Sequence, residues 1–331
     1  MTALLLVLAL ACILAGAFAF TNAVEWAGHR LDLGAGAVGA LLAAVSTALP
    51  ESIIPVVAIV RGDPAGEEVA VGAILGAPFM LATVAMTLVG LSAVAFRRRR
   101  EQGRKLLVHR PTLKRDLLFF LAALGTALVL GLGVDHWVRY AAAPLFVLAY
   151  GAYVVATLRR SGETQSEEEL PDLVVDPANR RPPPGWLIAL QFLGGLALIV
   201  GGAHLFVEEL IVVAERLGLA PLVLSLLLAP LATELPEKAN SFLWIREGKD
   251  ALALGNVTGA MVFQSTLPVA VGLAFTGWEL SRYALLAGSL ALIGGAVALW
   301  SLHLRRRFTA PAIAAWAALF TAFGVTVVVG A

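Results

Sequence analysis

Residues 47–51 read Thr-Ala-Leu-Pro-Glu, and residues 233–237 read Thr-Glu-Leu-Pro-Glu. The two pentapeptides lie 186 positions apart. With this shift, residues 16–51 match residues 202–237 at 13 of 36 positions without a gap. Apolar bias aligns leucines and alanines by chance, but it does not align a threonine, a proline and a glutamate in one register. The chain therefore contains an internal repeat.

A second block of identities follows at a shift of 183 residues and aligns Gly72 with Gly255 and Gly76 with Gly259. Glycines four residues apart share one face of a helix and allow close contact with another helix. We therefore predict two repeat units, at about 36–96 and about 219–276.

Composition places the repeats in a membrane. The 331 residues are 59% hydrophobic and 14% charged, whereas soluble domains are about 45–50% apolar and about 25% charged. Apolar runs of about 20 residues span a bilayer as helices, and these runs lack the alternation of barrel strands. The sequence predicts an all-α polytopic membrane protein with ten transmembrane helices, at 3–24, 36–60, 68–96, 117–134, 137–158, 186–213, 219–245, 251–276, 283–303 and 309–330.

Basic residues are distributed unevenly between the two sides of this arrangement. If the loops are assigned to alternating sides, 19 of the 24 Lys and Arg residues fall on the side opposite the N-terminus. Cytoplasmic loops carry the excess of Lys and Arg. We therefore predict a multi-pass protein of the cell membrane with cytoplasmic basic loops and both termini outside.

The longest polar stretch, 159–185, is acidic and rich in proline, which is typical of a flexible linker. It separates a first set of five spans (1–158) from a second set (186–331). Because five is odd, the second half enters the membrane from the opposite face, which predicts inverted-topology repeats with broken helices at the midplane. We interpret the linker as a cytoplasmic connector without chemistry, with a regulatory role as the alternative.

The repeated motif brings ionisable groups to the centres of two spans. Pro50 and Pro236 each remove a backbone donor, so each helix is expected to kink or break there. Glu51 and Glu237 follow directly, and a charge at that depth costs roughly 2.5–3.5 kcal/mol. Two symmetry-related carboxylates supply hard oxygen ligands for Ca²⁺, Na⁺ or protons. We predict that both bind a cation; the alternative is that they are protonated and hydrogen-bond between helices.

Other polar side chains share these helices. Thr47 and Thr233 lie one turn before the two glutamates and occur in both copies. Glu234 is four residues from Lys238, so the two can pair on one helical face; in the alternative, Glu234 is a third carboxylate of the site. Further accessory ligands on these helices, each equally explained by helix packing, are Ser46, Ser52 and Asn240.

Both pentapeptides are followed by a helix with a Gly-x-x-x-Gly pattern, and the second of these begins GKDALALGNVTGA (248–260). These features resemble the α-repeats of the sodium/calcium exchanger family, within the calcium/cation antiporter superfamily. The resemblance covers about half of the chain. It implies exchange of Ca²⁺ for Na⁺ or H⁺ by alternating access, with Glu51, Glu237, Thr47 and Thr233 as cation ligands.

The sequence departs from the family pattern at several ligand positions. Family members have an Asn or Asp where this chain has Leu81 and Gln264, so Gln264 is retained only as an accessory candidate. The family has a serine at four further positions, which are here Ala48, Glu234, Ala77 and Ala260. A site with fewer oxygen ligands shifts the expectation toward proton coupling.

We therefore predict a secondary-active cation antiporter that exchanges Ca²⁺ or another cation for Na⁺ or H⁺. The alternative is a non-transporting membrane binding or scaffold protein with the exchanger fold; channel activity is a lesser one. We expect no enzyme, because neither H-E-x-x-H nor G-x-S-x-G occurs. The expected partners are the lipid bilayer and inorganic cations, with no nucleic acid and no cofactor besides the transported cation.

Overall fold

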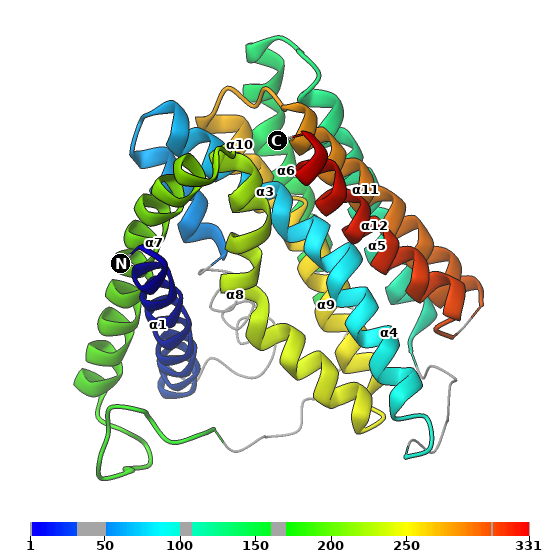
Figure 1. Cartoon of the computed structure of the whole chain (residues 1–331). Helices are drawn as coiled ribbons and strands as arrows, with labels where there is room; N and C mark the ends of the chain where they lie inside the picture. Colours follow the sequence, from blue (N-terminus) through cyan, green and yellow to red (C-terminus); the bar gives the residue numbers. More distant parts are fainter. Residues whose placement is uncertain (1, 32–50, 100–107, 160–169, 306, 331) are drawn as a thin grey trace.

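The structure is a computed structural model that describes residues 2–31, 51–99, 108–159, 170–305 and 307–330. Its regular elements are helices, as predicted (Figure 1). In chain order they are α1 (Thr2–Arg30), a short helix Glu51–Val60, α3 (Pro64–Met80), a π-helical turn η1 (Leu81–Ala85), α4 (Met86–Ala95), α5 (Arg110–Leu130), α6 (His136–Leu158), α7 (Gly185–Leu217), α8 (Pro221–Arg246), α9 (Asp250–Gln264), α10 (Leu267–Phe275), α11 (Arg282–Ala298), a second π-helical segment η2 (Leu299–Leu304) and α12 (Ala310–Gly330).

Seven helical segments within the described ranges are long and apolar enough to cross a membrane, which confirms a multi-pass membrane protein. The predicted division between the fourth and fifth spans is present, because α5 ends at Leu130 and α6 begins at His136. Of the predicted second span, 36–50 lies outside the described residues. The count of ten spans remains a prediction.

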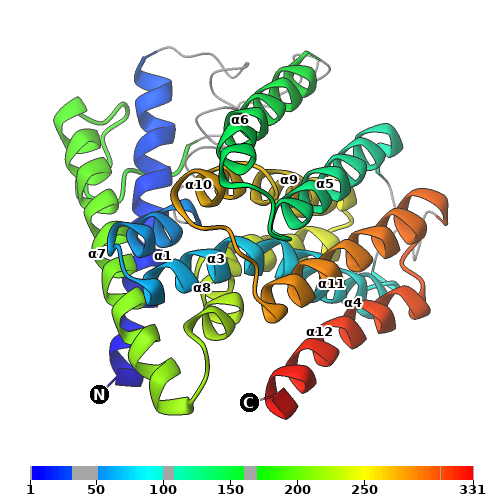
Figure 2. The ribbon, with the colours of Figure 1, turned by 90° about the horizontal axis from the view of Figure 1, so that it is seen from above.

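Figures 1 and 2 show how the helices are arranged around the centre of the bundle. α1 and α7 lie side by side at one edge, and α3 and α8 lie between this pair and α5, α11 and α12. Glycines allow α1 and α7 to approach closely: a Cβ atom at Gly16 would lie 2.8 Å from the Gly195 carbonyl oxygen, and one at Gly202 would lie 3.0 Å from the Ala9 carbonyl oxygen. Gly16 and Gly202 are also equivalent positions of the sequence repeat.

The contact between α3 and α8 is equally close, as the glycine spacing predicts. A Cβ atom at Gly76 would lie 2.8 Å from the Leu226 Cα, and one at Gly72 would lie 2.8 Å from the Ser225 Cβ. The Ser225 hydroxyl donates a hydrogen bond of 2.7 Å to the Val69 carbonyl oxygen. At the repeat-equivalent Gly255 and Gly259, no described residue lies within 4 Å of such a Cβ atom.

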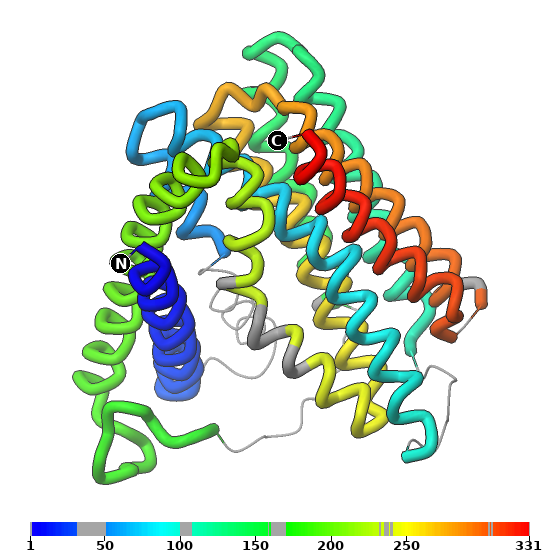
Figure 3. Tube along the Cα trace, in the orientation of Figure 1, coloured from blue at the N-terminus to red at the C-terminus, as the bar shows by residue number. Residues whose placement is uncertain are grey.

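The helix interruptions differ from those expected at the Pro-Glu pairs. α8 is continuous from Pro221 to Arg246 and bends along its course (Figure 3), so the helix break expected at Pro236 does not occur. A bend accommodates a single missing backbone donor. The clear break lies at 265–266, between α9 and α10, where Pro268 cannot donate to the Gln264 carbonyl oxygen. In the third segment, the π-helical turn η1 begins at Leu81.

The linker is not a flexible connector where the structure describes it. Residues 170–184 pack on α1 and α7, and Leu173 is only 3% exposed against Trp26 and Leu187. The Trp26 indole donates a hydrogen bond of 2.9 Å to the Pro171 carbonyl oxygen, and the Val175 amide donates one of 2.9 Å to the Gln191 side chain. The flexible interpretation is therefore wrong for 170–184, because buried polar partners on α1 and α7 satisfy its backbone.

Asp176 organises the centre of this docked segment. Its carboxylate accepts hydrogen bonds from the Arg180 guanidinium, at 2.9 Å, and from the Ala178 and Arg180 amides, at 3.1 Å each. The Arg180 side chain, with help from the two amides, holds the pKa of this carboxyl below its ordinary value of 3.8. A lowered pKa stabilises the docked segment above that value, and the contribution is lost as the pH falls through the folded-state pKa.

We expect Asp176→Asn to increase amide hydrogen exchange at Ala178 and Arg180 at neutral pH, because the ionised acceptor is lost. The difference from the wild type should shrink as the pH falls through the lowered pKa of the native carboxyl, because the wild-type side chain then also becomes neutral. Asp172→Asn is the matched control, since the Asp172–Arg181 pair is largely exposed. Equal protection of Asp176→Asn and the wild type at neutral pH would contradict this role.

We expect Gly76→Ala to destabilise the protein by about 1–3 kcal/mol, because the new Cβ atom overlaps the backbone of Leu226. Thermal unfolding in detergent measures the effect. Gly125→Ala in α5 is the control: no described residue lies within 4 Å of its Cβ position, so better helix propensity should leave stability unchanged or higher. Similar unfolding temperatures for Gly76→Ala and the wild type would rule out a tight crossing.

Candidate functional site

Glu51 lies at one end of a small cavity in the helix bundle. The cavity is formed by the helix Glu51–Val60, α3 and α8, and its size suits about one water-sized particle. The described residues that line it are Glu51, Ile54, Ala73, Ala77, Ala229, Pro230 and Thr233. Among these, the Glu51 carboxylate and the Thr233 hydroxyl are the polar groups, and the others are apolar.

Gln264 brings a fourth helical segment to Glu51. Its side-chain amide donates a short hydrogen bond to the Glu51 carboxylate across 213 positions of sequence, and its side chain is 1% exposed. Gln264 is the last residue of α9, directly before the break. The side-chain amide that donates to Glu51 also carries a carbonyl oxygen, which is a possible cation ligand next to this carboxylate.

The residues of the break itself bond locally. The Thr266 hydroxyl donates to the Val262 carbonyl oxygen at 2.8 Å, and the Ser265 hydroxyl donates to the same oxygen at 3.1 Å. These bonds satisfy carbonyls that the interrupted helix leaves without backbone donors. They hold Ser265 and Thr266 to α9, so Gln264 is the residue of this turn that extends to Glu51.

Thr233 presents a hydroxyl from α8. It donates to the Ala229 carbonyl oxygen at 3.2 Å and keeps its own oxygen as an acceptor toward the cavity. Glu237 is one turn further along α8, on the same helical face. The side chains of Glu237 and Asn240 lie outside the description, and so do residues Ser46 and Thr47.

The predicted pair of Glu234 and Lys238 is present. The Lys238 ammonium lies 2.8 Å from a Glu234 carboxylate oxygen, and the two side chains are 6% and 1% exposed. Glu234 is not among the described residues that line the cavity. The alternative in which Glu234 is a third carboxylate of the site is therefore not supported.

The structure thus brings Glu51, Thr233 and Gln264 together from three separate elements. Ser52 follows Glu51 and is half-buried. Ala77, at a position where the family has a serine, contributes only a methyl group to the wall. The arrangement offers carboxylate, hydroxyl and amide oxygens, the ligand types of hard cations.

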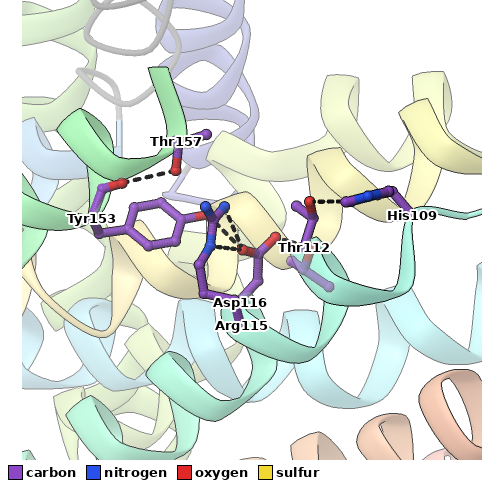
Figure 4. Close-up of polar contacts among 7 residues, drawn as sticks. His109, Thr112, Arg115, Asp116, Tyr153 and Thr157 are labelled. Carbon is purple, nitrogen blue, oxygen red and sulfur yellow. Dashed lines mark hydrogen bonds and ion pairs between the residues drawn. The ribbon is translucent and has the colours of Figure 1, made fainter. Parts of the chain in front are cut away.

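A second buried polar cluster lies around Asp116, which the sequence analysis placed outside the spans (Figure 4). One Asp116 oxygen accepts from Arg115, at 3.0 Å, and from the Tyr153 hydroxyl, at 2.9 Å. The other oxygen accepts from the Thr258 hydroxyl of α9 at 3.1 Å. Asp116 is 2% exposed and joins α5, α6 and α9.

Sequence reasoning missed this cluster because it began the fourth span at residue 117. The available signal was a lone acidic residue at the end of a basic run, RPTLKRD (110–116), at the start of an apolar helix. α5 begins at Arg110, which puts Asp116 in its second turn. The Arg115 guanidinium also lies 4.7 Å from the centre of the Tyr153 ring, a favourable cation–π distance.

Fold and cavity together describe a multi-pass helical membrane protein in which a carboxylate and a hydroxyl meet at a small cavity between the helix Glu51–Val60, α3 and α8. The family model described as "Sodium/calcium exchanger protein" matches residues 1–159 and 187–329, and the chain belongs to this family. The family consists of exchangers, which are transporters and not enzymes. The resemblance found in the sequence is therefore confirmed.

Individual proteins agree with this assignment. CaxA of Alkalimonas amylolytica is 25% identical over 275 residues, which cover 80% of each chain. The crystal structure of the H⁺/Ca²⁺ exchanger CAX superposes with a TM-score of 0.72 at 19% identity, covering 99% of this chain and 82% of that one. The sodium-calcium exchanger NCX_Mj superposes with a TM-score of 0.56 at 18% identity, covering 99% and 97%.

We expect Asp116→Ala to destabilise the protein by about 1–3 kcal/mol, because Tyr153 and the buried Thr258 lose their acceptor. Tyr153→Phe removes one hydrogen bond and should cost less. Thermal unfolding in detergent measures both, and Asp135→Asn, at an exposed helix start without a side-chain cap, is the control. Equal unfolding temperatures for Asp116→Ala and this control would contradict a structural role of the cluster.

Proposed function

We propose that the protein is a secondary-active cation antiporter that binds its cation at Glu51 and Glu237. Thr47 and Thr233 assist, and Gln264 acts as an accessory ligand. The observation that carries the proposal is that Glu51 lines one cavity with Thr233 and also accepts a hydrogen bond from Gln264, so three parts of the chain meet at this carboxylate. A carboxylate inside a membrane protein, close to further oxygen donors, marks an ion pathway by default.

The proposed architecture is ten helices in two inverted repeats of five, which exchange access to the site between the two sides of the membrane. Two observations support it. α1 and α7, the first helices of the two halves, pack against each other through the equivalent glycines Gly16 and Gly202. The third and eighth segments both depart from regular α-helix at equivalent places: a π-helical turn begins at Leu81, and α9 ends at Gln264.

The number and kind of candidate oxygen ligands favour a divalent cation that is exchanged for protons. Ca²⁺ takes six to eight oxygen ligands, and two carboxylates with Thr233, Gln264 and water approach this number. Leu81 is 2% exposed and apolar, so the third segment adds no side-chain ligand there, and room for several Na⁺ ions is reduced. CAX, named as an H⁺/Ca²⁺ exchanger, is the structural relative with the higher TM-score of the two above.

The non-transporting alternative has one observation in its favour. Leu81, Ala77 and Ala260 stand where the family has polar residues, which removes several oxygen donors at once. In that case the protein keeps the fold and binds a cation or a partner without exchange. Transport by the purified protein distinguishes the two functions.

The direct test is uptake of radioactive Ca²⁺ into vesicles that contain the purified protein, under a pH gradient and then under a Na⁺ gradient. We expect uptake driven by one of the gradients, and a loss of about 100-fold or more in Glu51→Gln, because a central charged ligand becomes neutral. Glu247→Gln is the matched control, since the Glu247–Lys249 pair is more than half exposed at the end of α8. Full transport activity of Glu51→Gln would contradict the proposed cation-binding site.

Uptake under neither gradient would favour the non-transporting alternative, provided that the protein is folded. A screen of other divalent and monovalent cations then decides whether the cargo or the transport itself was wrongly assigned.

A further inference from the structure

Lys238 is a buried cation in the interior of α8, the helix of the predicted seventh span. It lies in α8, it is 6% exposed, and its ammonium pairs at 2.8 Å with Glu234, which is 1% exposed. Ionisable residues inside a membrane are costly and are associated with function. A buried ion pair is also a weak source of stability, because apolar residues of similar volume often do as well or better. Stability alone therefore does not account for the pair.

The pair lies beside the proposed ligands on α8. Thr233 and Glu237 are four residues apart and share one helical face, and Glu234 and Lys238 follow each of them by one residue. The ion pair therefore runs parallel to the ligand face, rotated by about 100°. Thr233 lines the cavity, so the pair lies within about one helical turn of the site.

The sum of the charges near the proposed site shows why the position of the pair matters. Glu51, Glu234 and Glu237 together would give the region three negative charges. Lys238 neutralises Glu234, which leaves a net charge of about −2 for mobile ions if both remaining carboxylates are ionised. One divalent cation or two monovalent cations balance that charge.

We infer that Lys238 is a tethered cation of the site: it holds Glu234 in a permanent pair and so limits the positive charge that mobile ions supply. This inference rests on the proposed function, because it concerns the charge of the same cation site. It makes Glu234 and Lys238 specificity-determining residues and not ligands. Two opposite effects follow. Loss of Glu234 leaves a positive charge beside the site, and loss of Lys238 leaves an additional negative charge.

The test is Ca²⁺ binding to the purified protein in detergent, by isothermal titration calorimetry at mildly alkaline pH. We expect Glu234→Gln to weaken binding at least about ten-fold and Lys238→Gln to strengthen it at least about ten-fold, because a unit charge within about 10 Å of a divalent cation has an effect of that size. The double variant should lie within about three-fold of the wild type, since both charges are removed together.

Two controls separate charge from folding. Lys238→Arg keeps the positive charge and should bind Ca²⁺ like the wild type, as should Asp172→Asn in an exposed ion pair far along the chain. Breaking a buried pair is strongly destabilising, so size-exclusion chromatography must show that each variant is folded. If Lys238→Gln does not fold, the comparison of Glu234→Gln with the double variant decides: binding by the double variant should be at least about ten-fold tighter.

Shifts in the same direction for both single variants, or shifts below about three-fold in both, would overturn the inference in favour of a packing role. Failure of the proposed function has a different signature: the wild type binds Ca²⁺ but does not exchange it in vesicles, while the opposite shifts of the variants persist. A folded wild type that binds no Ca²⁺ overturns the inference.

Discussion

The close approach of α3 and α8 determines where a site can exist in this protein. Gly72 and Gly76 let the backbones of the two helices meet at Leu222 and Leu226. The residues one position on, Ala73 and Ala77, then face Ala229 and Thr233 across the cavity with methyl-sized side chains. A larger residue at either glycine would separate the helices, and a larger residue at either alanine would fill the space. The cavity is thus a direct result of four small residues on one helix face.

This contact, and the repeat that contains it, could be predicted from the sequence. Glycine spacing, the T-x-L-P-E motif and the long apolar runs are local or periodic signals, and each can be recognised in a single sequence. The Glu234–Lys238 pair was also predictable, because residues four apart in a helix meet whatever the tertiary fold. The break expected at Pro236 is absent, because α8 continues through this position and a bend can accommodate one missing backbone donor. The break between α9 and α10 lies instead at 265–266, just before Pro268.

The remaining features depend on tertiary packing and leave little trace in one sequence. Gln264 reaches Glu51 over 213 positions, and only resemblance to a family had singled it out. Asp116 contacts Thr258 over 142 positions, and hydropathy placed it just before the predicted fourth span, where nothing indicated a partner in α9. The docking of 170–184 depends on Trp26 and Gln191, which belong to helices on either side of it. Composition indicates disorder for such a segment because it does not record the partners that a fold provides.

Asp116 and Glu234, which are buried, and Glu51, which is half-buried, are carboxylates with different partners, and the difference bears on the proposed function. Asp116 is bonded by Arg115 together with two hydroxyls, and Glu234 is bonded by Lys238, so in both a resident cation opposes the negative charge. Glu51 accepts from the amide of Gln264, a neutral donor that stabilises a carboxylate without cancelling its charge. A carboxylate treated in this way retains its attraction for a mobile cation, whereas a guanidinium or ammonium partner removes it. Asp116 and Glu234 also contact or belong to the helices around Glu51. Asp116 accepts from Thr258 of α9, the helix that carries Gln264, and Glu234 lies next to Thr233 on α8. In the proposed antiporter, Asp116 and Glu234 therefore keep their charges paired, and Glu51, which accepts from an amide, is a group whose charge an exchanged ion can balance.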